Sequence, residues 1–258
     1  MQGISEIKKI YGKIGSYDKA NLELFIKDFS ADDRAGVRDM VEKAAKKLEL
    51  YDAEVARSIK MLENERKYYD EGVQYICGID EVGRGPLAGP VVACAVILPK
   101  DEMILGLNDS KQLSKAKREE LYEVILKKAV CCEIGMASEK VIDDINILQA
   151  TFVAMREAIS KLKIKPDILL NDAVHIPEVD IRQVPIIKGD AKSASIAAAS
   201  IVAKVTRDRI MAEYDELYPG YNFAKHSAYG VPKHVEAIKR LGPCPIHRRT
   251  FITNIWKE

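Results

Sequence analysis

The sequence predicts an α/β domain with a mixed sheet flanked by helices, preceded by a small all-helical appendage. Two apolar, strand-like runs follow one another at residues 75–81 and 90–98, and strands then alternate with helices. Residues 39–69 contain no glycine or proline and repeat apolar side chains at three- and four-residue steps, as one long amphipathic helix would. We therefore expect a helical extension over residues 1–71 and the α/β domain over residues 72–258.

The remaining elements follow from local signals. Ser114 and Asn146 are good N-caps, and the segment after residue 190 is rich in alanine and serine, which favours a long helix. The other expected helices are residues 4–11, 22–29, 114–129, 146–161, 191–214 and 233–240, and the other expected strands are residues 131–137, 166–172 and 183–187.

Composition limits the class of protein. The chain has 258 residues, 47% of them hydrophobic, and a net charge of +1, so it can bury a core but does not attract polyanions as a whole. Basic residues outnumber acidic ones from Lys188 onward, which modestly favours nucleic-acid binding. The five cysteines form no Cys-x-x-Cys pair, and no run has the length of a membrane span. We expect a reduced, cytoplasmic monomer without disulfides or a zinc site.

Two adjacent carboxylates end the first predicted strand. Asp80 and Glu81 follow an apolar run and precede a glycine-rich turn that contains Arg84. A carboxylate buried on a strand is costly unless a cation or hydrogen bonds compensate. This position therefore indicates a functional site.

Two further acids stand where they can reach the same site. Asp172 ends another apolar strand, and ligands of open α/β sheets bind beyond the carboxyl ends of strands. Asp190 precedes the long helix, where it can cap the helix or face the site. Four carboxylates without His or Cys select Mg²⁺ or Mn²⁺, and two such ions about 4 Å apart can hydrolyse a phosphodiester.

The glycine turn also allows a different interpretation, a nucleotide-binding loop. Gly83 and Gly85 would let the backbone approach a phosphate closely. No Gly-Lys-Ser/Thr follows, and the neighbouring acids would repel a phosphate unless a divalent cation lay between them. The pattern thus favours a metal-bridged phosphodiester over a small phosphorylated ligand.

Four ordered motifs between about residues 73 and 251 resemble those of bacterial ribonuclease HII. The first is Gly-Ile-Asp-Glu-Val-Gly-Arg-Gly-Pro at residues 78–86, and the second is Leu-Asn-Asp-Ser-Lys at residues 107–111. The third combines Lys-Gly-Asp at residues 188–190 with Ser-Ile-Val-Ala-Lys-Val-Thr-Arg-Asp at residues 200–208. The last is His-Arg-Arg at residues 247–249 with Phe251. Chance agreement of four ordered motifs is rare.

The resemblance implies a ribonuclease H-like fold and hydrolysis of the RNA strand of RNA–DNA hybrids. It also implies incision 5′ of ribonucleotides embedded in duplex DNA, leaving 3′-hydroxyl and 5′-phosphate ends, with Mn²⁺ or Mg²⁺. The family's catalytic, metal-binding acids fall on Asp80, Glu81, Asp172 and Asp190. Its substrate-binding positions fall on Gly83, Arg84, Gly85, Ser110, Lys111 and Tyr229. The glycine–arginine–glycine element would sense the ribose 2′-hydroxyl, and Tyr229 would read the junction with DNA.

The chain departs from this family's usual pattern in three places. It has Ser-Ala-Tyr-Gly-Val at residues 227–231 where Lys-Gly-Tyr-Gly-Thr is usual, and Asn171 stands where an apolar residue is usual. The extension before Glu71 resembles that of some Gram-positive versions. It could clamp DNA, bind a protein partner or cover the core, although its balanced charge disfavours DNA binding by itself.

Several basic side chains and histidines have no role in these motifs. Lys204 and Arg207 are expected in solvent, in ion pairs or at the substrate backbone. The histidines at residues 175, 226, 234 and 247 are scattered without a metal-ligand spacing, so loop or surface positions are expected for them. A catalytically weak, nucleic-acid-binding relative remains the alternative function, and the presence of all four acids favours the enzyme.

Overall fold

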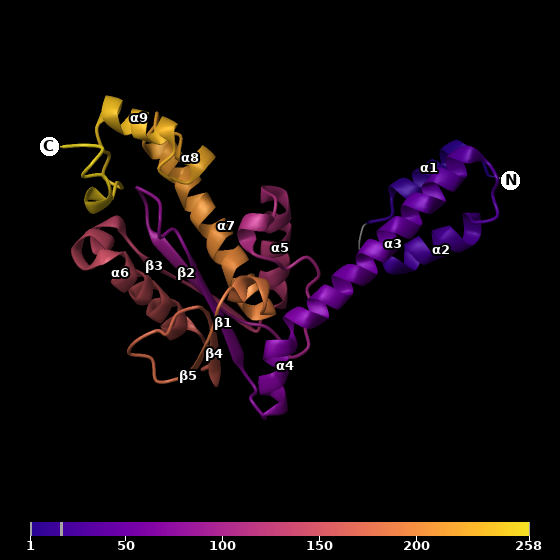
Figure 1. The fold of residues 1–258 in the computed structure, drawn as a ribbon, viewed down its shortest axis with the longest axis horizontal. Coiled ribbons are helices and arrows are strands. Elements are labelled where there is room, and N and C mark those ends of the chain that lie inside the picture. The colour runs from indigo at the N-terminus through magenta and orange to yellow at the C-terminus, as the bar shows by residue number, and fades with distance from the viewer. Residues whose placement is uncertain (1, 16–17, 258) are drawn as a thin grey trace. The chain divides into compact units, whose positions relative to one another are not determined.

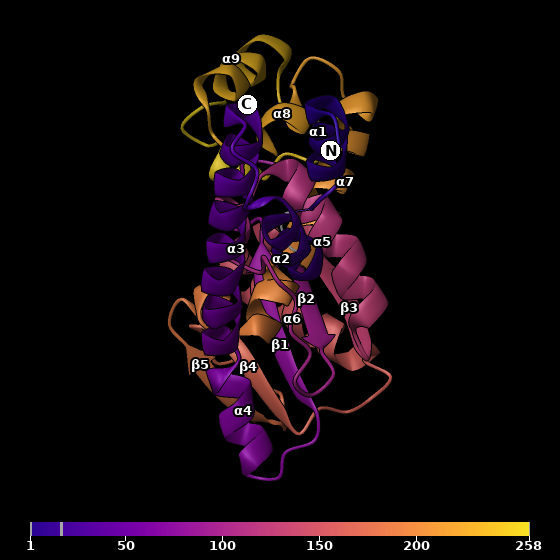
Figure 2. The same ribbon diagram turned by 90° about the vertical axis from the view of Figure 1, so that its right-hand side faces the viewer.

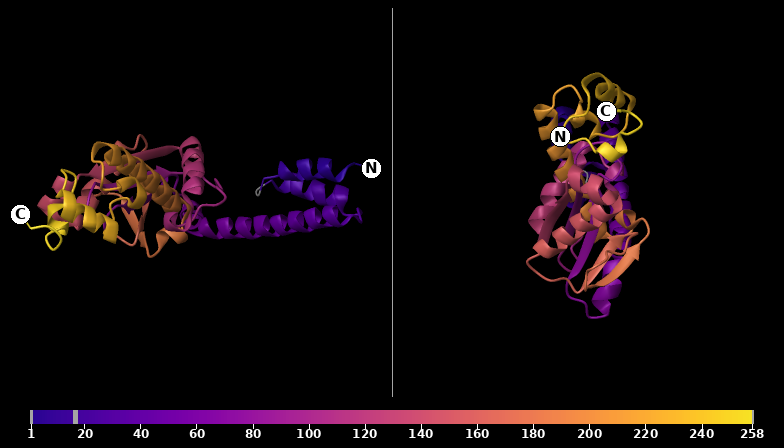
Figure 3. Two further views of the ribbon diagram at one scale, coloured as in Figure 1. Left: turned by 90° about the horizontal axis from the view of Figure 1, so that it is seen from above. Right: turned by 90° about the vertical axis from the view of Figure 1, so that its left-hand side faces the viewer.

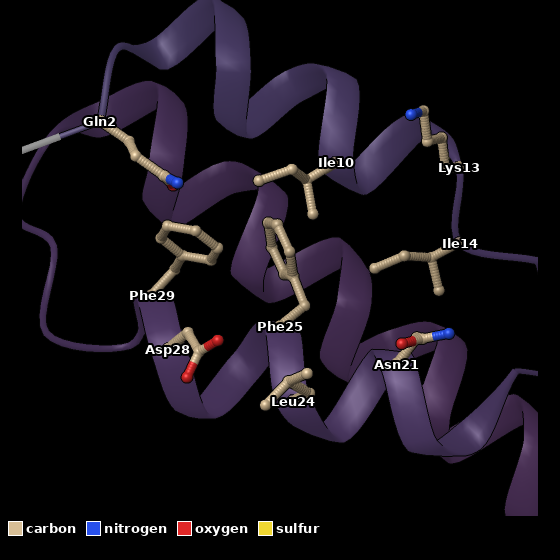
Figure 4. A pocket seen from close by; sticks show the side chains of 9 residues that line it. All are labelled: Gln2, Ile10, Lys13, Ile14, Asn21, Leu24, Phe25, Asp28 and Phe29. Carbon is tan, nitrogen blue, oxygen red and sulfur yellow. The ribbon is translucent and has the colours of Figure 1, made fainter.

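The computed structural model describes residues 2–15 and 18–257, and the chain divides into two compact units, Met1–Lys60 and Met61–Glu258. The first unit contains helices α1 (Ile4–Gly12), α2 (Lys19–Phe29) and nearly all of α3 (Ala35–Met61). Helices α1, α2 and the first part of α3 lie side by side (Figure 3). Ile7, Phe25 and Met40 are among the buried residues of the small core that they share. A cavity of about 320 Å³ opens between α1 and α2, with Phe25 and Phe29 in its wall (Figure 4).

The boundary between the units lies earlier than the expected one at residue 71. The single helix expected over residues 39–69 is two helices, α3 and α4 (Glu63–Asp70), interrupted at Leu62. Leu62 and Tyr68 are buried in core clusters of the second unit, so α4 belongs to that unit. The break thus coincides with the burial of Leu62, and no glycine or proline marks it in the sequence.

The second unit contains a five-stranded mixed sheet in the order β3-β2-β1-β4-β5 (Figure 2). The strands are β1 (Ile76–Val82), β2 (Val91–Ile97), β3 (Cys131–Ala137), β4 (Ile168–Asp172) and β5 (Arg182–Ile186). Strand β2 runs antiparallel to β1 and β3, whereas β1, β4 and β5 are parallel. The expected strands and the mixed α/β fold are confirmed.

Helices cover both faces of this sheet (Figure 1). All of β2 is buried, and its residues alternate between the two faces of the sheet. On one face, Val92 and Cys94 belong to the core covered by α5 (Lys115–Lys128) and α7 (Ala194–Leu217). On the other face, Ala93 and Ala95 belong to the core covered by α6 (Glu139–Lys161). A Cβ at Gly78 of β1 would collide with the α7 backbone at Ser195, so glycine permits this close packing. The helix lies directly over the strand that carries Asp80.

The remaining elements are the helices that follow α7 and short 3₁₀ helices in the loops of the second unit. Helices α8 (Phe223–His226) and α9 (Pro232–Leu241) follow α7, and short 3₁₀ helices are η1 (Ser110–Gln112), η2 (Gly189–Ala191) and η3 (Arg249–Phe251). Helix α6 starts at Glu139, with Ser138 as its N-cap, and not at the expected Asn146. Asn146 interrupts the helix with a φ of 67° and caps the following turn. Among the described residues, no helix combines the length and apolar character needed to cross a membrane.

Candidate active site

The expected carboxylates gather at one edge of the sheet. Strands β1 and β4 pair in parallel up to the residues just before Asp80 and Asp172. Asp190 lies in η2, after β5, and the neighbouring Gly189 donates its backbone N–H to Oδ1 of Asp172 at 2.8 Å. The chain therefore brings acids from three separate segments to one place.

Asp190 does not cap the helix that follows it. Ser193 is the N-cap of α7, and its hydroxyl oxygen accepts a hydrogen bond from the N–H of Ile196 at 3.2 Å. Asp190 is only 8% exposed, and the charge of Asp172 acts on it. Of the two roles expected for Asp190, its position agrees with the one that faces the site.

Burial and mutual repulsion raise the pKa values of three of these acids. Burial, followed by the charge of Glu81, raises the pKa of Asp80 well above its ordinary value. Burial also raises the pKa of Glu81; the charge of Arg84 opposes this, and that of Asp172 adds to it. Burial and then Asp172 raise the pKa of Asp190. The carboxylates are thus near enough to disfavour one another's ionised forms.

This set of side chains fits a hard divalent cation. All four offer carboxylate oxygens, and Oε2 of Glu81 is buried without a hydrogen-bond partner. Among residues 2–15 and 18–257, no three His, Cys, Asp or Glu side chains are arranged so that they could hold an ion as they stand. The donor chemistry and the position therefore suit Mg²⁺ or Mn²⁺, and the side chains would have to turn inward to coordinate it.

Ser110 and Lys111 lie beside the acids in different ways. Ser110 is buried, and its hydroxyl is 2.9 Å from that of Ser200, which in turn hydrogen-bonds Asp80. Its hydroxyl supports Asp80 from the protein interior. The side chain of Lys111 is exposed; partial burial lowers its pKa, but Asp109 and then the acids of the site raise it overall. Lys111 is therefore an exposed cation at the edge of the carboxylate group.

The glycine-rich loop after β1 lies against Tyr229. A Cβ added at Gly85 would be 3.7 Å from Cε1 of Tyr229, whose residue is 41% exposed. Gly83 has a φ of +94°, and a Cβ there would collide with a buried arginine, so only glycine fits. Arg84 is exposed and lies 3.3 Å from Oε1 of Glu81. The loop thus connects the acids to the tyrosine.

Arg248 holds the glycine-rich loop from the interior. Its guanidinium is fully buried and donates to the carbonyls of Gly83 at 2.6 Å, Arg84 at 2.9 Å and Gly89 at 2.8 Å. Burial lowers the pKa of Arg248 to about 9, so it stays protonated at neutral pH. The sequence pattern placed Arg248 in a motif without indicating this role.

Arg207 joins the glycine-rich loop to the tyrosine loop. It is also fully buried, and it donates to the carbonyls of Ala88 at 3.1 Å, Pro90 at 3.0 Å and Ser227 at 3.0 Å. The expectation that Arg207 lies in solvent, in an ion pair or at the substrate backbone is wrong. Planar guanidinium groups suit such sites because one side chain can serve several carbonyls at once.

The unusual residues before Tyr229 have local explanations. Ser227 donates its hydroxyl to Oδ1 of Asp208 at 2.7 Å, and Lys204 pairs with the same carboxylate at 2.6 Å. Ser227 and Ala228 have φ values of 47° and 64°. Glycine adopts this left-handed conformation without strain, which explains why it is usual at the position of Ala228.

Glu65 of α4 holds the chain next to Asp190. Its buried Oε1 accepts hydrogen bonds from the Ser193 hydroxyl at 2.5 Å and the Ser195 N–H at 2.9 Å. Asn64 adds a bond to the Lys192 carbonyl at 3.0 Å. The helix that the sequence assigned to the extension therefore supports the first turn of α7.

Comparisons with known proteins identify the family. A family model described as ribonuclease HII matches residues 77–254, and one described as the ribonuclease HII N-terminal domain matches residues 4–69. The chain belongs to the ribonuclease HII family. It is 60% identical over 231 residues to a ribonuclease HII from Lachnoclostridium phytofermentans, covering 89% of this chain and 90% of the relative. It is 50% identical to one from Clostridioides difficile, covering 98% of each.

The fold agrees with solved structures of the same family. Ribonuclease HII from Archaeoglobus fulgidus, solved as a complex with PCNA, matches with a TM-score of 0.59 and 30% identity, covering 71% of this chain and 97% of that one. Ribonuclease HII enzymes are hydrolases. This chain is accordingly an endoribonuclease that acts on RNA–DNA hybrids.

Proposed function

We propose that this ribonuclease HII cleaves the RNA strand of hybrids and also incises 5′ of single ribonucleotides in duplex DNA, leaving 3′-hydroxyl and 5′-phosphate ends. The observation that carries the proposal is the contact between Tyr229 and Gly85. Gly85 lies in the loop that directly follows Asp80 and Glu81 in the chain. Tyr229 and the glycine-rich loop, which would recognise one nucleotide, then lie at a fixed distance from the acids, which would hydrolyse the adjacent phosphodiester.

Asp80, Glu81, Asp172 and Asp190 would hold the metal ions. Bound divalent ions supply Lewis-acid stabilisation of the phosphodiester and lower the pKa of attacking water. The protein supports this by holding Asp80 and Glu81 on β1 and Asp172 on β4, and the Ser200 hydroxyl and the Glu81 N–H hydrogen-bond Asp80. Lys111, exposed at the edge of the group, would bind a neighbouring backbone phosphate.

Recognition of the ribose would come from the glycine-rich loop. Gly83 allows the left-handed turn of this loop, and Gly85 leaves its exposed backbone without a side chain, so the loop can approach a 2′-hydroxyl, which is what distinguishes RNA from DNA at one nucleotide. The exposed ring of Tyr229 would pack on the adjacent deoxyribonucleotide. Arg84, half-exposed beside Glu81, is available to the phosphate between the ribonucleotide and the adjacent deoxyribonucleotide.

An incision assay tests the function. The substrates are a DNA duplex with one ribonucleotide, the same duplex without it, and an RNA–DNA hybrid, each with Mn²⁺ or Mg²⁺. We expect cleavage 5′ of the single ribonucleotide and none of pure DNA. Asp80→Asn should lower the incision rate by at least about 100-fold, because it removes one metal-binding carboxylate.

Asp144→Asn provides the matched control, because Asp144 is an exposed acid of α6. It should cleave as the wild type does. Normal incision by Asp80→Asn would refute the metal-site assignment, and binding without cleavage by the wild type would favour the catalytically weak relative.

A further inference from the structure

Two buried histidines connect the carboxyl-terminal motif to Tyr229. His234 of α9 and His247 of the following segment are 0% and 1% exposed, and their Nε2 atoms lie 3.1 Å apart. Nδ1 of His234 lies 3.0 Å from the carbonyl oxygen of Tyr229. At the other end, the N–H of Cys244 donates to Nδ1 of His247 at 2.9 Å. These distances form a continuous chain of hydrogen bonds.

The chain of bonds has one consistent direction. A carbonyl oxygen only accepts, so Nδ1 of His234 carries the proton and, in the neutral ring, its Nε2 accepts. Nε2 of His247 must then be the donor, which leaves its Nδ1 to accept from Cys244. The Cys244 thiol, 3.1 Å from the same Nδ1, can donate to it as well. The two rings therefore carry opposite tautomers, His234 with Nδ1–H and His247 with Nε2–H.

The surroundings keep both rings neutral. Burial and then the charge of His234 lower the pKa of His247 to about 4, and burial lowers the pKa of His234. A second proton on His234 would set two N–H groups against each other at the 3.1 Å contact, and one on His247 would set its Nδ1–H against the N–H of Cys244 at 2.9 Å. The charge of Arg249 also opposes a second proton on His247, and a proton on His226 would oppose one on His234. A metal ion between the rings is equally disfavoured, because each ring nitrogen already has a hydrogen-bond partner.

The end of this chain of bonds is the backbone of the substrate-reading loop. The Tyr229 carbonyl accepts from His234 and from the N–H of Val231 at 2.8 Å. One residue earlier, the Ala228 carbonyl accepts from the N–H of Leu87 at 2.8 Å. The backbone of the tyrosine is thus held on both sides, while its ring remains partly exposed beside Gly85.

We propose that His234 and His247 are positioning residues: their hydrogen-bonded pair fixes the Tyr229 backbone and so sets the preference of the enzyme for single ribonucleotides in DNA. The part that concerns preference rests on the proposed function. The pair touches no reacting atom, so it should affect the recognition of the substrate more than the hydrolysis of a long hybrid.

Two variants of His234 separate the hydrogen bond from simple packing. His234→Asn keeps an N–H where Nδ1 lies, whereas His234→Leu fills a similar volume without a donor. We expect His234→Leu to lower kcat/KM for the single-ribonucleotide duplex about fivefold to tenfold, with a change below about twofold on a long hybrid. His234→Asn should recover most of the loss. Equal losses on both substrates by a folded His234→Leu, or no rescue by His234→Asn, would overturn the proposal.

A double-mutant cycle tests whether the effect passes through Tyr229. If it does, adding His234→Leu to Tyr229→Ala should cause no further loss on the single-ribonucleotide duplex. Losses that multiply would show that the histidines act by another route.

Measurements without substrate test the pair independently of the proposed function. Nitrogen NMR of labelled histidine should show His234 protonated at Nδ1 and His247 at Nε2, and the same tautomer on both rings would refute the chain of bonds. Hydrogen exchange at residues 228–231 should accelerate in His234→Leu and stay slow in His234→Asn. If the pair behaves as expected but the wild type does not incise single ribonucleotides, the proposed function fails and the loop-fixing role stands.

Discussion

The two halves of the site are built by different means. The carboxylate half stands on β1 and β4, whose parallel pairing brings Asp80 and Asp172 to neighbouring strand ends. The recognition half consists of loops at residues 83–89 and 227–231, and buried side chains from distant segments hold them. Like charges need a rigid support to remain close together, and the sheet provides it, whereas loop carbonyls need donors, and Arg207, Arg248 and His234 provide them.

This difference predicts where the molecule is vulnerable. The carboxylate half should stay folded when one carboxylate is replaced by a neutral side chain, because repulsion among the remaining carboxylates is then weaker. The recognition half should lose its structure when one buried donor is removed, because several carbonyls then lack partners at once.

Arg248→Met should have the largest effect on stability. It leaves the carbonyls of Gly83, Arg84 and Gly89 without their donor, so we expect the free energy of unfolding to fall by about 3 kcal/mol or more and incision to be lost. Denaturant titration followed by the incision assay measures both. Arg240→Met on the exposed end of α9 is the control and should stay within about 0.5 kcal/mol of the wild type. A stable, active Arg248→Met protein would contradict the role assigned to the buried guanidinium.

Gly83→Ala should have the next largest effect, and Gly72→Ala is its matched control. Both glycines have a φ near +90°, but a Cβ at Gly83 would collide with Arg207, while nothing lies within 4 Å of one at Gly72. We expect Gly72→Ala to cost about 1 kcal/mol from backbone strain, and Gly83→Ala about 2–3 kcal/mol. Thermal unfolding of both proteins measures the difference. Equal losses would mean that the collision with Arg207 is absorbed without cost.

Glu65→Ala should destabilise the carboxylate half by about 1–3 kcal/mol, because it removes the acceptor for Ser193 and Ser195. Burial raises the pKa of Glu65 above its ordinary 4.5. The folded protein therefore retains this proton to a higher pH than the unfolded chain, and the contribution of Glu65 to stability declines as the pH rises above about 4.5.

Glu65→Gln keeps an acceptor oxygen and should remove this part of the pH dependence. Unfolding of the wild type and Glu65→Gln between pH 4 and pH 8, at constant ionic strength, gives the comparison. A slope that is identical in the two proteins would show that Glu65 does not hold its proton more tightly in the folded state.

Ala228→Gly should have the smallest effect. Glycine relieves the left-handed strain at a φ of 64°, but it loses a buried methyl group and makes the unfolded chain more flexible. These contributions oppose each other, so stability should change by less than about 1 kcal/mol and incision should be unchanged. Ala228→Val, which adds bulk and β-branching in a left-handed conformation, should be clearly less stable by thermal unfolding.

The sequence predicted the elements whose signals are local. Strand β2 was found because every residue from Val91 to Ile97 is apolar, and α5 because Ser114 caps it. Asp80, Glu81 and Asp172 were found because carboxylates at the ends of apolar strands are unusual, and Asp190 because it precedes the long helix. Ligands of open α/β sheets bind beyond the carboxyl ends of strands, so convergence of the strand-end acids could be expected.

What depends on tertiary packing could not be predicted in the same way. The break at Leu62 coincides with burial of that side chain in the core of the second unit, and the helical periodicity of the sequence continues through it. Arg207 stands among other charged residues of α7, so its burial has no sequence signal. His234 and His247 are separated by a helix end and a proline-rich turn, and no spacing rule brings two such rings to 3.1 Å.

The position of α4 has a consequence for shortening the chain. Removal of residues 1–60 would leave the second compact unit with its own first helix. Removal of residues 1–71 would also take away Leu62, Glu65 and Tyr68, and with them the acceptor for the Ser193 hydroxyl and the Ser195 N–H beside Asp190. The two truncated enzymes differ by only a short helix, yet in the second the first turn of α7 would lose this support and part of the core beneath it would be uncovered.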